Sequence, residues 1–256
     1  FDTWTLEKNV SISATFQSHN TKVLAAGRRG AIVSLQTLAG QDDINEFEVV
    51  YVNLDTRRTQ VLLSGVSATN APCLAEAPGG EFAVFINDHR AKRVLFKAMR
   101  MNTATASAQV TAENEIDSGV FGKYACAYAS PDFLFIGNNG VLIRIGRDGS
   151  VKQRLAMFER SDKKSVSLQY PQLVAEDGVL LLAVTTAKKL PQAGGGSIYW
   201  SIMFLRSTDQ GRTWFDHSGA RRALPLPLDY DASLAITPAN GGSDNNWLLG
   251  LDLVHG

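Results

Sequence analysis

Long hydrophobic runs and an excess of charge of either sign are both missing from this sequence. No apolar stretch approaches the roughly 18 residues that a membrane-spanning helix needs, so we expect no membrane span. The 256 residues include 25 basic and 25 acidic side chains. A formal net charge of zero gives no long-range field to attract a phosphate backbone, and we therefore expect no nucleic-acid partner.

Cysteine is nearly absent as well. The two cysteines, Cys73 and Cys126, are too few for a disulfide framework and lack the spacing of metal ligands. Each lies inside an apolar run, where cysteine usually behaves as a small hydrophobic residue. We accordingly interpret both as small core residues, and we expect neither a metal site nor a cofactor.

Helical periodicity is also scarce. Short runs rich in Val, Ile, Leu and Phe alternate with clusters of Gly, Asp and Asn, which is typical of an all-β protein. The runs recur in a fixed order: strand, tight turn, strand, variable loop, strand, turn, strand. Units with this order begin near residues 21, 71, 124 and 170, and the start of a fifth lies near residue 233.

Four-stranded units that repeat about every 45–60 residues predict the blades of a β-propeller. A β-sandwich also spaces its strands about 8–12 residues apart, but it need not repeat them in groups of four. We therefore predict an all-β fold, a β-propeller of four-stranded antiparallel blades, as a single domain over residues 1–256. The last of about five blades is incomplete and residues 2–12 read as an outer strand, so we expect further strands after Gly256 and about six or seven blades in a longer chain.

The segment RSTDQGRTWFD interrupts the apolar strands with regularly spaced polar residues. It matches the pattern S-x-D-x-G-x-T-W at Ser207, Asp209, Gly211, Thr213 and Trp214. The pattern resembles the Asp box of the BNR repeat in sialidases and related propellers, where it forms the hairpin between the third and fourth strands of a blade. The carboxylate accepts hydrogen bonds from turn amides, the glycine permits the turn, and the tryptophan packs between sheets. We interpret it as a structural element on the face opposite the ligand site.

The resemblance to sialidases covers the scaffold and not the catalytic site. Retaining sialidases bind the sugar carboxylate with three arginines, one of them in an Arg-Ile-Pro strand, and they use a Tyr–Glu nucleophile with an acid Asp. No Arg-Ile-Pro occurs in this sequence, and Arg144 in the segment LIRIG belongs to an expected third strand. The resemblance therefore implies the propeller fold and does not imply sialidase activity.

Polar residues gather where a propeller would open its ligand-binding face. The loops that enter the innermost strands and those that join the second to the third strands open on one face. Sorting residues by this rule collects side chains that suit sugar hydroxyls and carboxylates. The catalytic candidates are His19, His89 and Tyr170; the substrate-binding candidates are Asn70, Asp88, Arg90 and Tyr124; the same loops hold Asn138, Asn139, Lys188 and Lys189.

Two stretches resemble blades of the BNR-repeat polysaccharide lyases, the ulvan-lyase-like propellers. They are residues 70–89, NAPCLAEAPGGEFAVFINDH, and 170–186, YPQLVAEDGVLLLAVTT. The family uses His and Tyr for proton abstraction and an Arg that neutralises the uronate carboxylate, which implies proton-transfer roles for His89 and Tyr170. Asn70 stands where a first His is typical, and Thr185 and Thr186 stand where the Arg is typical. Without the Arg, the enolate-like charge lacks its main stabiliser.

We therefore predict a sialidase-like propeller that acts on or binds carbohydrate, as a polysaccharide lyase or glycoside hydrolase on acidic glycans. The alternative is a non-catalytic structural or receptor-binding module in a larger phage or cell-surface assembly. An acid pair with an Arg cluster would favour the enzyme, and none is evident in the sequence. We expect a glycan ligand, an extracellular or cell-surface location, and either further strands or a protein partner beyond Gly256.

Overall fold

The computed structural model describes residues 23–39, 44–68, 71–88, 91–119, 122–159, 166–189, 197–228, 234–237 and 251. These residues form four antiparallel sheets, each built from consecutive strands in chain order. The first sheet holds β1 (Val23–Ala25), β2 (Gly30–Ala39), β3 (Ile44–Asn53) and β4 (Thr59–Ala68). The second holds β5 (Cys73–Ala77), β6 (Glu81–Asp88), β7 (Arg93–Asn102) and β8 (Ser107–Asp117).

The other two sheets repeat this order. The third holds β9 (Tyr124–Ala129), β10 (Asp132–Gly137), β11 (Val141–Ile145) and β12 (Val151–Ala156). The fourth holds β13 (Val166–Glu176), β14 (Val179–Lys189), β15 (Ser197–Ser207), β16 (Trp214–Phe215) and β17 (Arg221–Arg222). The prediction of an all-β propeller of four-stranded antiparallel blades is confirmed.

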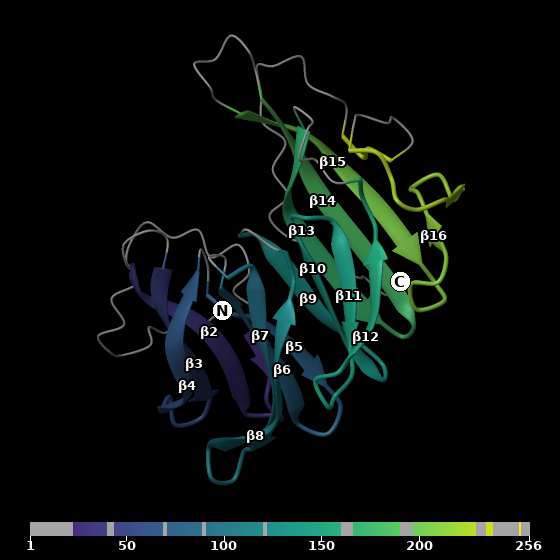
Figure 1. The fold of residues 1–256 in the computed structure, drawn as a ribbon. Coiled ribbons are helices and arrows are strands. Elements are labelled where there is room, and N and C mark those ends of the chain that lie inside the picture. The colour runs from purple at the N-terminus through teal and green to yellow at the C-terminus, as the bar shows by residue number, and fades with distance from the viewer. Residues whose placement is uncertain are drawn as a thin grey trace.

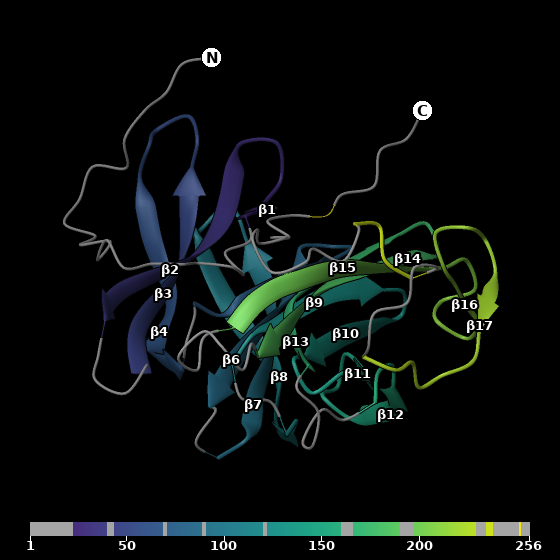
Figure 2. The ribbon, with the colours of Figure 1, turned by 90° about the horizontal axis from the view of Figure 1, so that it is seen from above.

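The sheets follow one another in chain order around a common axis (Figure 1). Their first strands lie side by side, β1 against β5, β5 against β9 and β9 against β13, and residues of all four line one groove. The described residues form an arc of blades and not a closed ring; Figure 2 shows the same blades from above. None of the described segments is a helix that could span a membrane.

Three apolar clusters fill the three interfaces between neighbouring sheets. Side chains alternate between the two faces of a strand, so a middle sheet must be apolar on both faces. In β6, Phe82 and Val84 pack towards the first sheet, whereas Ala83 and Phe85 pack towards the third. This double burial explains why the central strands read as nearly continuous hydrophobic runs.

The residues expected to open a fifth unit lie against the fourth sheet instead. Ala235 forms an antiparallel bridge with Met203 of β15, and backbone hydrogen bonds join Leu234 and Ile236 to the same strand. The hairpin strand β16 pairs with β15 only near its other end, at Arg206. Residues 234–237 thus take the place of a fourth strand along β15. The rest of the expected fifth unit, apart from residue 251, lies outside the described residues, as does the expected strand at residues 2–12.

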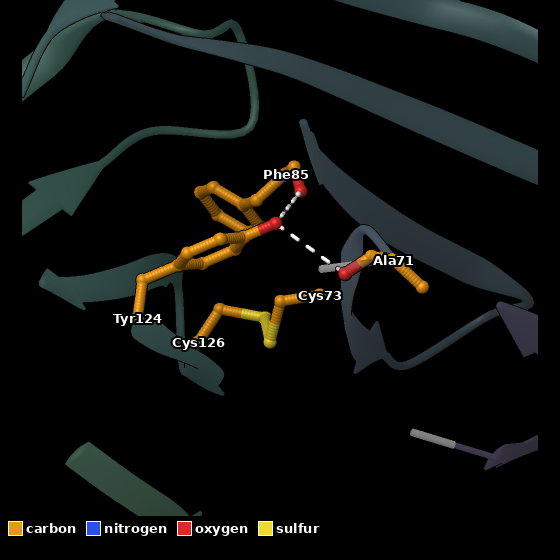
Figure 3. Close-up of a disulfide and its surroundings, with 5 residues drawn as sticks. All are labelled: Ala71, Cys73, Phe85, Tyr124 and Cys126. Atoms are coloured by element: carbon orange, nitrogen blue, oxygen red, sulfur yellow. Dashed lines mark hydrogen bonds between the residues drawn. A yellow bond between two sulfur atoms is a disulfide. The ribbon is translucent and has the colours of Figure 1, made fainter. Parts of the chain in front are cut away.

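The two cysteines are buried in the core as predicted, but they are bonded to each other, which the interpretation as small hydrophobic residues did not include. Cys73 of β5 and Cys126 of β9 are both fully buried, and they form a disulfide between the first strands of the second and third sheets (Figure 3). First strands converge near the axis, which brings the two Cα atoms to 6.2 Å although 53 positions separate them in the chain. Spacing along the sequence does not reveal this proximity.

Candidate functional site

Four of the predicted site residues fall outside the part of the chain that the structure describes. They are His19, Asn70, His89 and Arg90. Their roles stay predictions. The neighbouring strand end is described: the Asn87 amide donates a hydrogen bond to the carbonyl of Gly122 at 3.2 Å. The end of β6 therefore lies beside the segment that enters β9.

Tyr124 is a core residue, which corrects its predicted role in substrate binding. Its side chain is completely buried between the second and third sheets, against the disulfide. The hydroxyl donates to the carbonyls of Phe85 at 3.2 Å and Ala71 at 3.4 Å, as Figure 3 shows. Burial raises the pKa of this phenol, so it remains a neutral donor inside the core. It joins two blades and faces no solvent.

Asp88 is exposed at the end of β6. Its carboxylate accepts a hydrogen bond from the Ala91 amide at 3.1 Å, so part of its role is to shape the turn after the strand. It also borders a groove of about 470 Å³ between the first two sheets, together with Ser67 and Arg93. Its predicted role in ligand binding stays a prediction.

Tyr170 lies at a β-bulge in β13 and has a strained backbone. The register of β13 against β14 shifts between Gln169 and Gln172, and Tyr170 adopts a φ of 45°. A bulky residue in this left-handed region is rare and marks positions where the surroundings impose the conformation. The bulge turns the Tyr170 side chain towards β15, where its hydroxyl lies 2.9 Å from that of Tyr199.

The Tyr170–Tyr199 pair is an edge-to-face contact, with ring centroids 5.2 Å apart. Tyr170 is only 3% exposed, whereas Tyr199 is partly exposed. Burial, and then the hydrogen bond to Tyr199, raise the pKa of Tyr170. Tyr170 therefore stays protonated at neutral pH, and Tyr199 is the member of the pair that solvent reaches.

Lys123 completes the cluster from the neighbouring blade. It directly precedes β9, and its ammonium nitrogen lies 3.3 Å from the centroid of the Tyr170 ring. This is a close cation–π contact, which fixes the end of a flexible side chain. Burial lowers the pKa of Lys123 to about 8, and at neutral pH most of the molecules still carry the charge. We call Lys123, Tyr170 and Tyr199 the Lys–Tyr cluster.

A second lysine stacks on an aromatic ring in the fourth sheet. The Lys188 ammonium lies 4.5 Å from the centroid of the Trp200 ring. Trp200 directly follows Tyr199 in the sequence. Thr185 and Thr186, which stand where the lyase family has its arginine, are completely buried in β14. The Thr186 hydroxyl is 2.8 Å from that of Ser201, so this position carries neutral hydrogen bonding and no cation.

The turn from Ser207 to Trp214 has a structural role at the opposite end of the same sheet. The Asp209 carboxylate accepts hydrogen bonds from the Arg212 and Thr213 amides at 3.0 and 2.9 Å and from the Thr213 hydroxyl at 2.6 Å. The hydrogen bonds from Thr213 are the main cause that lowers the pKa of Asp209 to about 2. Gly211 has a φ of 86°, and Trp214 is 1% exposed in the core between the third and fourth sheets.

The same hairpin in the other sheets uses a simpler version of this turn. Side-chain oxygens of Asn53, Asn102 and Asp148 each accept a hydrogen bond from a backbone amide two residues later. Asn53 and Asn102 are the last residues of the third strands of their sheets, and Asp148 lies in the turn after the third strand of its sheet. The four turns thus lie on one face, and the Lys–Tyr cluster lies towards the opposite face.

Sequence reasoning missed Lys123, Tyr199 and Trp200. A signal existed for Lys123, because the rule that selected Tyr124 as a residue entering an innermost strand applies equally to its neighbour. No signal existed for the two aromatic residues, which lie within β15 and look like ordinary strand residues. Among the described residues, no group of three His, Cys, Asp or Glu side chains is placed to hold a metal ion.

Comparisons with known proteins give a likeness in fold alone. No protein-family model matches the chain, and no curated protein matches it in sequence. Among solved structures, polysaccharide lyase Uly1 aligns with a TM-score of 0.56 at 12% identity, over 88% of this chain and 59% of the lyase. A PL25 ulvan lyase bound to -[GlcA(1-4)Rha3S]- aligns with a TM-score of 0.59 at 10% identity, over 86% of this chain and 58% of the lyase. The chain spans less than two thirds of either protein, and it shares with them the propeller fold.

Proposed function

We propose that the protein acts on an acidic polysaccharide at the Lys–Tyr cluster and cleaves it by elimination. The observation that carries the proposal is Tyr170, a bulky residue with a positive φ at a bulge on the face opposite the structural turns. Strain of this kind persists where a side chain must be aimed at one place, as in binding and catalytic sites. The lyases of similar fold support this choice of chemistry, and we include the chain among the Asp-box propellers on the pattern of its Ser207–Trp214 turn.

The proposed reaction removes the proton at C5 of a uronic acid and breaks the bond between C4 and the glycosidic oxygen. Electrons from the C5–H bond form the C4–C5 double bond, and the leaving oxygen receives a proton. The partly exposed Tyr199 hydroxyl suits the donor of that proton, and Tyr170 positions it through their contact of 2.9 Å. Tyr199 regains its proton from water after the product leaves. We assign the proton acceptor to His89, which follows the strand end beside Gly122.

Hydrolysis fits the described residues less well. A glycoside hydrolase needs two carboxyl groups that flank the scissile bond. The Lys–Tyr cluster contains no carboxyl group. The hydroxyls of Thr186 on β14 and Ser201 on β15, which lie in the same sheet, are neutral. Elimination needs a donor, an acceptor and a cation, which this face can supply.

The test is to incubate the protein with a polysaccharide rich in glucuronic acid, such as ulvan, and to follow the ultraviolet absorbance of the unsaturated product. Replacement of Tyr199 or Tyr170 by Phe should lower turnover at least about 100-fold, because the proton donor or its support is lost. Tyr128→Phe is the matched control, since that hydroxyl contacts Arg147 on the face of the structural turns. Binding without unsaturated product would overturn elimination and favour a binding module.

We also propose that the protein works outside the cytosol. The Cys73–Cys126 disulfide is the supporting feature, because such bonds form and persist in oxidising compartments. Thiol titration of protein isolated under denaturing conditions from its source should find no free thiol. Two free thiols would contradict this location.

A further inference from the structure

An acidic sugar needs a cation at the site, and the expected position does not supply one. Thr185 and Thr186 occupy the place of the arginine, and both are completely buried. The neighbouring face nevertheless presents two lysines on aromatic rings, Lys123 and Lys188. They differ in position, because only Lys123 contacts the tyrosine pair.

Lys123 carries a charge with no carboxylate to neutralise it among the described residues. Other lysines of the sheets behave differently: Lys97 pairs with Glu113, and Lys152 lies 3.7 Å from Asp148. Within the part of the chain that the structure describes, the one charged, polar or ring contact of the Lys123 ammonium is with the Tyr170 ring. An ammonium has three N–H donors, so one can point at the ring while the others bind an anion.

Partial burial makes this cation a stronger partner for an anion. The surroundings have already removed part of the hydration shell of Lys123, which is the cause of its lowered pKa. An arriving carboxylate or sulfate meets an ammonium in a medium of lower dielectric constant than water, where the attraction between opposite charges is larger. The partial loss of hydration of Lys123 raises the free energy of the unbound protein. Binding of an anion to the ammonium would offset that increase.

We propose that Lys123 is the residue that binds the anionic group of the sugar, in place of the missing arginine. The ammonium would hold the carboxylate of the uronic acid beside the Tyr199 hydroxyl, so that the donor and the cation act on the same sugar unit. The assignment rests on the proposed function and adds to it: the substrate class is anionic, and one lysine sets that specificity. Lys188 contacts Trp200 and not the tyrosine pair, and it is not assigned this role.

The experiment measures binding of ulvan oligosaccharides, and of the same oligosaccharides with reduced carboxyl groups, to the full chain by titration calorimetry. Wild type should bind the acidic form at least about ten-fold more tightly than the reduced form. Lys123→Met should remove that preference and weaken binding of the acidic form at least about ten-fold, whereas Lys123→Arg should keep most of it. Lys152→Met is the matched control, because this lysine lies near the start of β12, beside the turn at Asp148 on the opposite face.

Thermal unfolding separates this role from a structural one. Lys123→Met should be at least as stable as wild type at pH 7, because the substitution removes a partly buried charge. Equal binding of the acidic and reduced forms by wild type, or unchanged preference in Lys123→Met, would overturn the assignment of Lys123 and leave the proposed function standing. Absence of any glycan binding or cleavage by wild type would overturn the proposed function, and the assignment with it.

Discussion

Removal of the Asp216 carboxylate should destabilise the protein more than removal of the other structural carboxylate of the turn region, that of Asp209. The side chain is 0% exposed, and it lies directly after the Ser207–Trp214 turn. Its Oδ1 accepts hydrogen bonds from the Ser218 amide at 2.8 Å, the Ser218 hydroxyl at 2.6 Å and the Ala220 amide at 3.0 Å. Its Oδ2 accepts from Nε of Arg222 at 2.7 Å and contacts a second guanidinium nitrogen at 2.6 Å.

The expected magnitude follows from what the substitution leaves behind. In Asp216→Ala the Arg222 guanidinium, three-quarters buried, loses the Asp216 carboxylate, and breaking a buried pair costs about 3–5 kcal/mol. Ser218 and Ala220 are exposed, so water can replace the lost acceptor for their amides, and we expect the lower end of that range, about 3 kcal/mol. Asp216→Asn keeps an acceptor for the amides and should cost less.

Urea denaturation followed by the fluorescence of the four tryptophans measures these differences by linear extrapolation. Asp55→Ala is the control, because Asp55 forms an exposed ion pair with Arg29 at 3.0 Å and should change the free energy of unfolding by less than about 1 kcal/mol. An effect of Asp216→Ala no larger than that of the control would refute the reasoning that a buried, multiply bonded carboxylate fixes this turn.

Three further predictions concern the same scaffold. Asp209→Ala should destabilise by about 1–3 kcal/mol through unsatisfied turn donors, and Trp214→Ala by about 3–5 kcal/mol through a cavity, both without direct effect on ligand contacts; full stability with loss of binding would contradict the structural role. The pKa values of Asp209 and Asp216 lie near 2, below the ordinary value of 3.8, so their stabilising contribution is complete above about pH 4 and disappears as the pH falls towards 2; an acid titration of unfolding that is unchanged in the double Asn variant would argue against it. Replacement of Cys73 and Cys126 together by Ser should lower the free energy of unfolding by about 2–4 kcal/mol, because the disulfide closes a loop of 53 residues; a thermal midpoint equal to that of wild type would count against a stabilising bond.

The local pattern of the sequence was sufficient to predict the strands and their grouping. The features that predict them are the alternation of apolar residues, the tight turns, and the Asn or Asp in the hairpin that joins the third and fourth strands of a sheet. These features depend on residues a few positions apart, so they can be recognised without knowing the fold. The Ser207–Trp214 turn is the clearest case, because its hydrogen bonds join residues within four positions of one another. Its place between β15 and β16 agrees with the prediction.

The sequence was less informative where a strand had more than one possible partner. The apolar pattern that begins at residue 233 fits an edge strand of one blade as well as the first strand of the next. Contact with β15 is what assigns residues 234–237 to the fourth sheet. The disulfide could not be predicted from local sequence for the same reason. Whether Cys73 and Cys126 meet depends on how closely the first strands of neighbouring blades approach the axis.

The sequence by itself determined that the chain forms four-stranded antiparallel blades and where their structural turns lie, because those features arise from local periodicity. Only the tertiary structure decided which face each side chain at the site occupies. Lys123 directly precedes β9 and Tyr124 is the first residue of that strand, and their side chains point to different blades. Tyr124 therefore enters the core towards the second blade, while Lys123 reaches Tyr170 on the fourth, and this difference of one position separates a packing residue from the cation of the candidate site.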